Sequence, residues 1–287
     1  MRTVCPFSKR FCIAYTQKSF KIDSLESDTL NRLFHETTSY LQGFRVEMIP
    51  HRKCHPSDEE HPATTLGLTL QKPTIQFVDS LNRLQRIEAI AHELVHLLLV
   101  YRFGLGVIGR RIPPQRTGQE VFSYFLSMDK DWIYLLGQVA NTVHHLILID
   151  YLKEEYGIES SLHRRLLHHS FCTTANDNDR DKESLYAKGL IAFEYERLIG
   201  KVDKVMNSFC QTELFWEAYG SAQKHFGGYT FQSIPTRFSY EENILSFLEG
   251  LGYQRQDFMF FPEVTCDYGF NPEGVSKQDV IGKIGGI

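Results

Sequence analysis

Residues Ala89–Val100 read AIAHELVHLLLV, and the rest of the chain is interpreted around this stretch. Only His92, Glu93 and His96 are polar here. An apolar run of this length, bounded by turn signals, predicts a buried helix. Burying two imidazoles and a carboxylate in such a helix costs free energy unless a partner compensates them. The sequence therefore predicts that something binds these three side chains.

The spacing of the two histidines indicates what that partner is. His92 and His96 are four residues apart, so in a helix both rings leave the same face about one turn apart. Two neutral imidazoles placed in this way can share one zinc ion, and Glu93 on the adjoining face can act on a water molecule at the metal. This H-E-x-x-H motif predicts a zinc-dependent hydrolase. The structural alternative is a core helix whose histidines bond to backbone carbonyls.

Composition limits the class of protein. The chain has 287 residues, of which 42% are hydrophobic and 13% aromatic, enough for one large core or a catalytic core with an appended helical part. A net charge of −4 gives no indication of a nucleic-acid surface. No apolar run approaches the ~20 residues of a membrane span, and no secretory signal is evident. Six cysteines without C-x-x-C pairs favour reduced thiols. We expect a cytoplasmic protein without nucleic-acid or membrane partners.

The chain before and around the motif predicts a small sheet followed by the metal helix. A helix is expected over 24–42, and alternating residues predict a strand over 44–49. Residues 51–65 are expected to form a polar loop, followed by strands over 66–70 and 74–78. Asp79 or Ser80 is the expected N-cap of the motif helix, which Arg102 and Gly104 end.

The remainder of the chain is expected to be mainly helical. A loop through Gly118 precedes the helices, and residues 173–181 read as a polar linker. From Phe261 onward the pattern is irregular. The expected helices span 119–128, 131–157, 160–172, 182–199, 203–225 and 239–250, the last with a Ser239/Glu242 capping box. The predicted fold is α+β, with a small N-terminal antiparallel or mixed sheet packed on the motif helix. The expected domains are 1–172, the catalytic core, and 173–287, a helical part, with a single compact unit of both as the alternative.

A third zinc ligand is expected from the helix over 131–157. Catalytic zinc normally takes three protein ligands and keeps one position for water. Gln138, Asn141 and His145 lie within roughly 60° of one another on a helix that is otherwise apolar. His145 is the predicted ligand, with Asn141 or Gln138 behind it. His144 and Asp150 are the alternatives.

The other polar groups receive weaker assignments. His163, His168, His169 and Cys172 are interpreted as a solvated helix end, with a separate structural metal as the alternative. An oxyanion partner is also expected from the C-terminal helices. The candidates for it are Tyr195, His225, Tyr186 and His169.

Together, these residues resemble the zincin metallopeptidases, specifically a compact, gluzincin-like intracellular type found in bacteria. The resemblance covers roughly residues 44–157 and is sharply specific only over 92–96. It implies that His92 and His96 bind Zn²⁺ and that Glu93 is the general base. The Asn-Glu pattern from which gluzincins take their third ligand is missing, and Arg102 stands where metzincins have a third histidine.

The resemblance also implies a peptide or protein substrate. In this family an edge strand before the metal helix binds an extended substrate, and residues 74–78 or 66–70 are the candidates. The expected reaction is peptide-bond hydrolysis, in which Glu93 accepts a proton from water and returns it to the leaving amine. The alternatives are a metal-binding regulatory protein without turnover and a hydrolase acting on a non-peptide amide.

Overall fold

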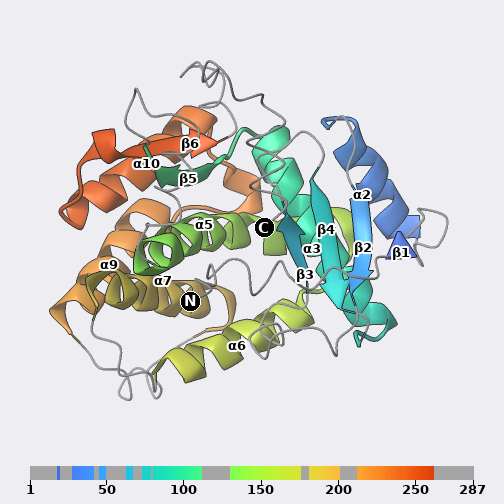
Figure 1. The fold of residues 1–287 in the computed structure, drawn as a ribbon, viewed down its shortest axis with the longest axis horizontal. Coiled ribbons are helices and arrows are strands. Elements are labelled where there is room, and N and C mark those ends of the chain that lie inside the picture. The colour runs from blue at the N-terminus through green and yellow to red at the C-terminus, as the bar shows by residue number, and fades with distance from the viewer. Residues whose placement is uncertain are drawn as a thin grey trace, which may run out of the picture. The chain divides into compact units, whose positions relative to one another are not determined.

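The computed structural model describes residues 18–19, 28–41, 45–49, 63–66, 73–78, 80–111, 130–175, 181–200 and 212–261 (Figure 1). The chain divides into two compact units. The first contains Met1–Leu98, Ile112–Met128 and Pro262–Ile287, and the second contains Leu99–Arg111 and Asp129–Phe261. The predicted limits 1–172 and 173–287 stay a prediction. Helix α6 (Ser161–Ala175) crosses that boundary and belongs to the same unit as α7 (Lys182–Leu198).

The first unit contains a four-stranded mixed sheet with the strand order β1-β2-β4-β3. β2 and β4 run parallel, and the two outer pairings are antiparallel. Helix α2 (Asp28–Thr38) precedes β2 and buries Leu30, Leu33 and Phe34. It ends at Thr38, before the expected end at 42, and residues 24–27 of the expected helix lie outside the described part. The strands are β1 (Lys18–Ser19), β2 (Arg45–Ile49), β3 (Ala63–Leu66) and β4 (Thr74–Val78).

Two of the three strand predictions are confirmed, and the third, over 66–70, can be compared with the structure only at Leu66. β2 lies within the strand predicted over 44–49 from alternation, and β4 covers the strand predicted over 74–78. β3 covers Ala63–Leu66, so the expected polar loop over 51–65 was wrong at its end, and residues 67–70 lie outside the described part. β4 is paired on both sides and is therefore an interior strand, whereas β3 is at the edge of the described sheet.

Helix α3 (Arg83–Tyr101) carries the H-E-x-x-H motif. Its N-cap is Asn82, and not Asp79 or Ser80. The Gln85 backbone N–H donates to Asn82 Oδ1 at 3.0 Å, and the Asn82 backbone N–H donates to Gln85 Oε1 at 3.1 Å. These two bonds form a reciprocal capping box. The predicted end at Gly104 is confirmed. Gly104 has φ +72°, a left-handed conformation that favours glycine at a helix end, and the Leu105 backbone amide donates to the Leu99 carbonyl six residues earlier.

The second unit is mainly helical. Helix α5 spans the predicted range, and Gly157 ends it with φ +65°. Helices α6 and α7 lie close to their predicted positions. Of the expected helix over 203–225, the described part begins at the N-cap Thr212. The helices are α5 (Lys130–Tyr156), α6 (Ser161–Ala175), α7 (Lys182–Leu198), α9 (Glu213–Phe226) and α10 (Arg237–Gly250), with short 3₁₀ turns η4 (Phe231–Ser233) and η5 (Arg255–Asp257).

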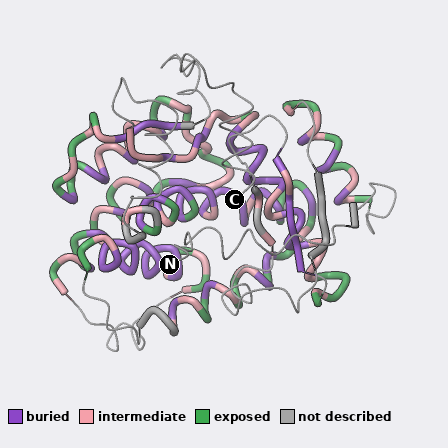
Figure 2. The backbone as a smooth tube through the Cα atoms, viewed as in Figure 1, coloured by how far each residue is buried: buried purple, intermediate pink, exposed green. Residues whose placement is uncertain are grey.

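Helix α7 forms the centre of this unit because it packs against α5, α6 and α9. It is buried continuously from Ser184 to Tyr195, and Figure 2 shows this run of buried residues in α7. Gly189 lets α9 approach closely, since a Cβ there would lie 2.5 Å from the Phe215 carbonyl oxygen. The apolar core around α7 includes Leu167, Phe171, Ile191, Ala192, Tyr195 and Phe215.

A two-stranded antiparallel sheet in the second unit was not predicted from the sequence. β5 (Val107–Arg110) falls in the expected loop after Gly104 and pairs with β6 (Phe258–Phe261). The expected capping box at Ser239 was also wrong. Thr236 is the N-cap of α10, and its hydroxyl accepts from the Ser239 amide. The helix predicted over 119–128 lies outside the described residues.

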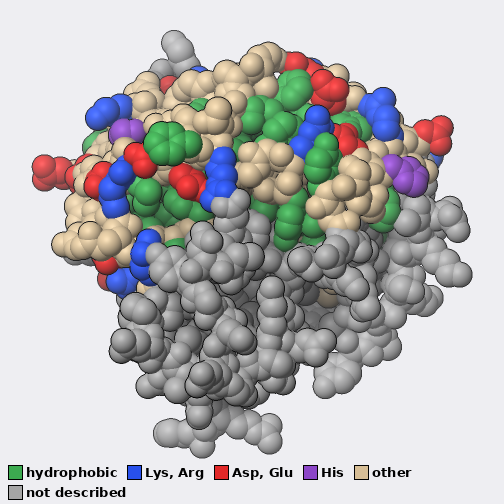
Figure 3. Space-filling model, turned by 90° about the horizontal axis from the view of Figure 1, so that it is seen from above, with side chains coloured by type: hydrophobic (Ala, Val, Ile, Leu, Met, Phe, Trp, Pro, Cys, Tyr) green, Lys and Arg blue, Asp and Glu red, His purple; other side chains and the backbone are tan. Residues whose placement is uncertain are grey.

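The two units together give an α+β protein with more helix than strand. In the described ranges, no helix is both long and apolar enough to cross a membrane. The face drawn in Figure 3 mixes basic, acidic and hydrophobic side chains. Large hydrophobic side chains are exposed at separate points of the chain, such as Leu84 on α3 and Phe238 on α10.

Candidate metal centre

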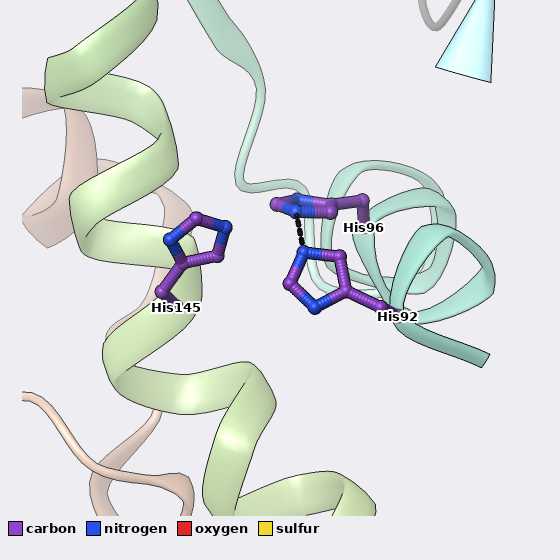
Figure 4. A group of neighbouring side chains, drawn as sticks. All are labelled: His92, His96 and His145. Carbon is purple, nitrogen blue, oxygen red and sulfur yellow. Dashed lines mark hydrogen bonds between the residues drawn. The ribbon is translucent and has the colours of Figure 1, made fainter. Parts of the chain in front are cut away.

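His92 and His96 project from one side of α3 (Figure 4). Their Nε2 atoms lie 3.1 Å apart, and the ring centroids are 4.8 Å apart. Two nitrogens bound to one tetrahedral zinc at 2.0–2.1 Å are separated by about 3.3 Å. His96 is buried and His92 is half-buried. The helix therefore holds the two rings at a separation suited to a shared metal ion.

Glu93 lies between them in sequence and contacts the sheet of the same unit. The Thr65 hydroxyl on β3 donates a 2.7 Å hydrogen bond to Glu93 Oε2. The edge strand of the described sheet thus holds the carboxylate that the motif assigns as general base.

His145, the predicted third ligand, lies on α5 in the second unit (Figure 4). Its Nδ1 is 2.7 Å from Glu194 Oε1 on α7. The Glu194 side chain is only 2% exposed. A buried carboxylate that accepts one ring N–H of a histidine fixes both the orientation of the ring and its tautomer. His145 is therefore held in one orientation, with Nδ1 directed at the carboxylate.

The other oxygen of Glu194 is bound as well. Gln138 Nε2 donates to Oε2 at 3.1 Å, and the Thr142 hydroxyl donates to it at 2.9 Å. Burial raises the pKa of Glu194, but His145 and His163, through charge and hydrogen bonding, hold it well below its ordinary value. These contacts favour the charged form of the buried Glu194 carboxyl group. Of the two residues expected behind His145, Gln138 makes this contact, while Asn141 is exposed.

His163 on α6 belongs to the same network, whereas the sequence placed it on a solvated helix end. Its ring packs edge-on against His145, with centroids 4.3 Å apart, and its Nε2 is 3.6 Å from Glu194 Oε1. Burial lowers the pKa of His163, with a further contribution from the charge of His145. Ligand atoms of His145, His163 and Glu194 lie within 4.8 Å of one another, close enough to hold a metal ion.

A comparison with known protein families, curated proteins and solved structures gives no match to this chain. Any functional assignment therefore rests on the chemistry of the chain's own side chains.

The two alternatives to His145 are placed differently. His144 is 1% exposed, and its Nε2 lies 2.9 Å from the Leu105 carbonyl, which can only accept a hydrogen bond. That nitrogen therefore carries a proton and has no lone pair for a metal. Burial lowers the pKa of His144 to about 4. Asp150 is half-buried and belongs to no metal-binding group among the described residues.

Two of the expected oxyanion partners, Tyr195 and Tyr186, make hydrogen bonds within the second unit. The Tyr195 hydroxyl lies 2.9 Å from His168 Nδ1, and the ring stacks on Phe171. The Tyr186 hydroxyl donates to Glu217 and to the Leu251 carbonyl. His168 Nε2 is 3.9 Å from Cys172 Sγ. The choice of an oxyanion partner from this set, including His169 and His225, stays a prediction.

Glu194 was not predicted from the sequence as a residue of the site. The signal was present, because a glutamate in the apolar segment of α7, AFEYERLI, needs a buried partner. The partners lie 49 and 31 residues away, at His145 and His163, and no local pattern joins them.

Proposed function

We propose that this protein is a zinc metallopeptidase of the zincin type. The observation that supports the proposal most strongly is the 3.1 Å separation of the His92 and His96 Nε2 atoms, one helical turn apart beside Glu93. A structural histidine pair in a core helix would not require a carboxylate between the two rings.

The donor set fits zinc better than a hard cation. Neutral imidazole nitrogens are common zinc ligands, whereas calcium and magnesium prefer carboxylate and carbonyl oxygens. Three histidines with a fourth position left to water is also an established set for catalytic zinc.

We propose His145 as the third ligand, through its Nε2. Its Nδ1 faces Glu194, which is the arrangement in which a metal-binding histidine donates its other ring N–H to a carboxylate. His144 fits this role less well, since its Nε2–H donates to a backbone carbonyl.

Zinc held by these residues would supply Lewis acidity, which makes water a stronger acid and a substrate carbonyl a stronger electrophile. The protein's own side chains carry out the proton transfer. The Glu93 carboxylate takes a proton from the attacking water and delivers it to the leaving amine nitrogen. The Thr65 hydrogen bond keeps Oε2 in a fixed orientation, so the carboxylate does not need to reorient between the two transfers.

The proposed substrate is an extended peptide that adds to β3. This strand pairs only with β4 in the described sheet and ends that sheet. Edge strands offer backbone N–H and C=O groups to a further strand. Because Thr65 on β3 contacts Glu93, a peptide paired with β3 would run close to the general base.

The test is Glu93→Gln in the zinc-loaded protein, assayed on an unstructured protein such as casein and on a mixed peptide library. General acid–base catalysis typically contributes about 10²–10⁴-fold, so the rate should fall by at least about 100-fold with zinc content unchanged. Glu88→Gln, on the same helix but outside the motif, is the matched control and should keep both. Full activity in Glu93→Gln contradicts the general-base role. Zinc binding without cleavage of any peptide favours the regulatory alternative.

A further inference from the structure

A buried polar network joins α5, α6 and α7 within the second unit, around a single carboxylate. Glu194 accepts from His145 through Oε1 and from Gln138 and Thr142 through Oε2. Gln138 also donates to Thr142 at 3.0 Å, so these two donors are themselves linked. A carboxylate so deeply buried is costly unless it is paired and hydrogen-bonded.

We infer that Glu194 is the positioning residue for the metal site, and that it sets zinc affinity through the His145 ring. The inference rests on the proposed function, because it assigns Glu194 a role only if His145 binds zinc. An Nδ1–H donated to a carboxylate keeps the Nε2 lone pair in place for the metal and makes that nitrogen more basic. The His145 ring is then held in one tautomer and at one angle.

The geometry favours this role over a separate metal ion held by the network itself. The 2.7 Å distance from His145 Nδ1 to Glu194 Oε1 is that of a charge-assisted hydrogen bond. Two ligand atoms that share a tetrahedral zinc stand about 3.3 Å apart. Moreover, Oε2 already accepts two hydrogen bonds from α5.

His163 also contacts the His145 ring. Its edge-on contact with His145, at 4.3 Å between centroids, restricts ring rotation, and its Nε2 faces the same carboxylate oxygen. The rotation of His145 is thus limited by one hydrogen bond and one ring contact, contributed by α7 and α6.

The experiment measures zinc affinity by competition with a chelator for wild type, Glu194→Gln and Glu196→Gln, together with the visible spectrum of the cobalt-substituted proteins. Glu196 is two residues further along α7 and accepts from Tyr219, so its variant controls for loss of a carboxylate on this helix. Carboxylates behind metal-binding histidines typically contribute about 10–100-fold in affinity. We expect a loss of that size and an altered cobalt spectrum in Glu194→Gln only.

Unchanged zinc affinity in a folded Glu194→Gln protein overturns the inference, and if the wild type still cleaves peptide the proposed function survives. A second zinc equivalent that disappears in His163→Ala would instead make the network a metal site and also overturn the inference.

Should Glu194→Gln fail to fold, Gln138→Met removes one donor to Glu194 Oε2 while keeping side-chain length. Zinc binding several-fold weaker supports the positioning role, and wild-type affinity contradicts it. A wild type that binds no zinc removes both proposals.

Discussion

Thr65 and Glu93 are 28 residues apart in sequence, and the Thr65 hydroxyl donates a 2.7 Å hydrogen bond to Glu93 Oε2. This contact links the edge strand of the described sheet to the motif helix. It connects the two elements that the proposed function needs, the strand that would receive substrate and the carboxylate that would move the proton.

Replacing Thr65 with Val should lower kcat without loss of zinc. Val removes the hydroxyl donor, and hydrogen bonds to charged groups contribute about 1.5–3 kcal/mol, which corresponds to roughly tenfold or more in rate. Thr65→Ser retains the donor and should stay within a few-fold of wild type. The measurement is kcat and KM of peptide hydrolysis beside zinc content. A Thr65→Val protein with wild-type kcat would show that the contact has no part in catalysis.

The metal-free protein should lose stability as the pH falls below about 6.5. Burial lowers the pKa of His144 to about 4 from its ordinary 6.5, so between these values the unfolded chain binds a proton that the folded chain does not. The free energy of unfolding linked to His144 is therefore highest above pH 6.5 and decreases as the pH falls toward 4. It amounts to about 2 kcal/mol between pH 7 and pH 5. Urea unfolding with a chelator present measures it. His144→Gln should show a smaller decrease, and an equal decrease would assign it to other groups.

Gly189→Ala should destabilise the second unit. The added Cβ would lie 2.5 Å from the Phe215 carbonyl oxygen and 2.9 Å from the Ala218 Cβ, so α7 and α9 would have to separate. Overpacking of this kind costs about 1–3 kcal/mol. Gly220→Ala on α9 is the control, because a Cβ there meets nothing within 4 Å. Thermal unfolding should show a lower Tm for the first variant and an unchanged or higher Tm for the second.

The fold could be predicted where the signal is local. The apolar segments of α3 and α5, and the glycines at 104 and 157, gave helix positions and ends that the structure confirms. β5 and β6 could not be found in this way, since they pair across about 150 residues and each is only four residues long. The cap at Asn82 was missed because three polar residues precede α3 and only the backbone geometry selects one.

In the candidate site, too, the local features could be predicted from the sequence and the long-range contacts could not. The i, i+4 spacing of His92 and His96 is a helical property, so their pairing was predictable from sequence. The contacts of Glu93 with Thr65 and of His145 with Glu194 depend on how separate elements pack. His163 was interpreted as a surface residue because two arginines follow it, yet α6 turns its ring toward Glu194.

The most direct test of the proposed metal centre is the zinc content of the purified protein after zinc is added and excess is removed. We expect about one zinc per chain in wild type, in keeping with one three-histidine site. His92→Ala and His145→Ala should each lose it, whereas His169→Ala, which alters an exposed histidine on α6, should keep it. A wild type without zinc, or a His92→Ala protein with unchanged zinc, would contradict the proposed metal centre and the peptidase activity that depends on it.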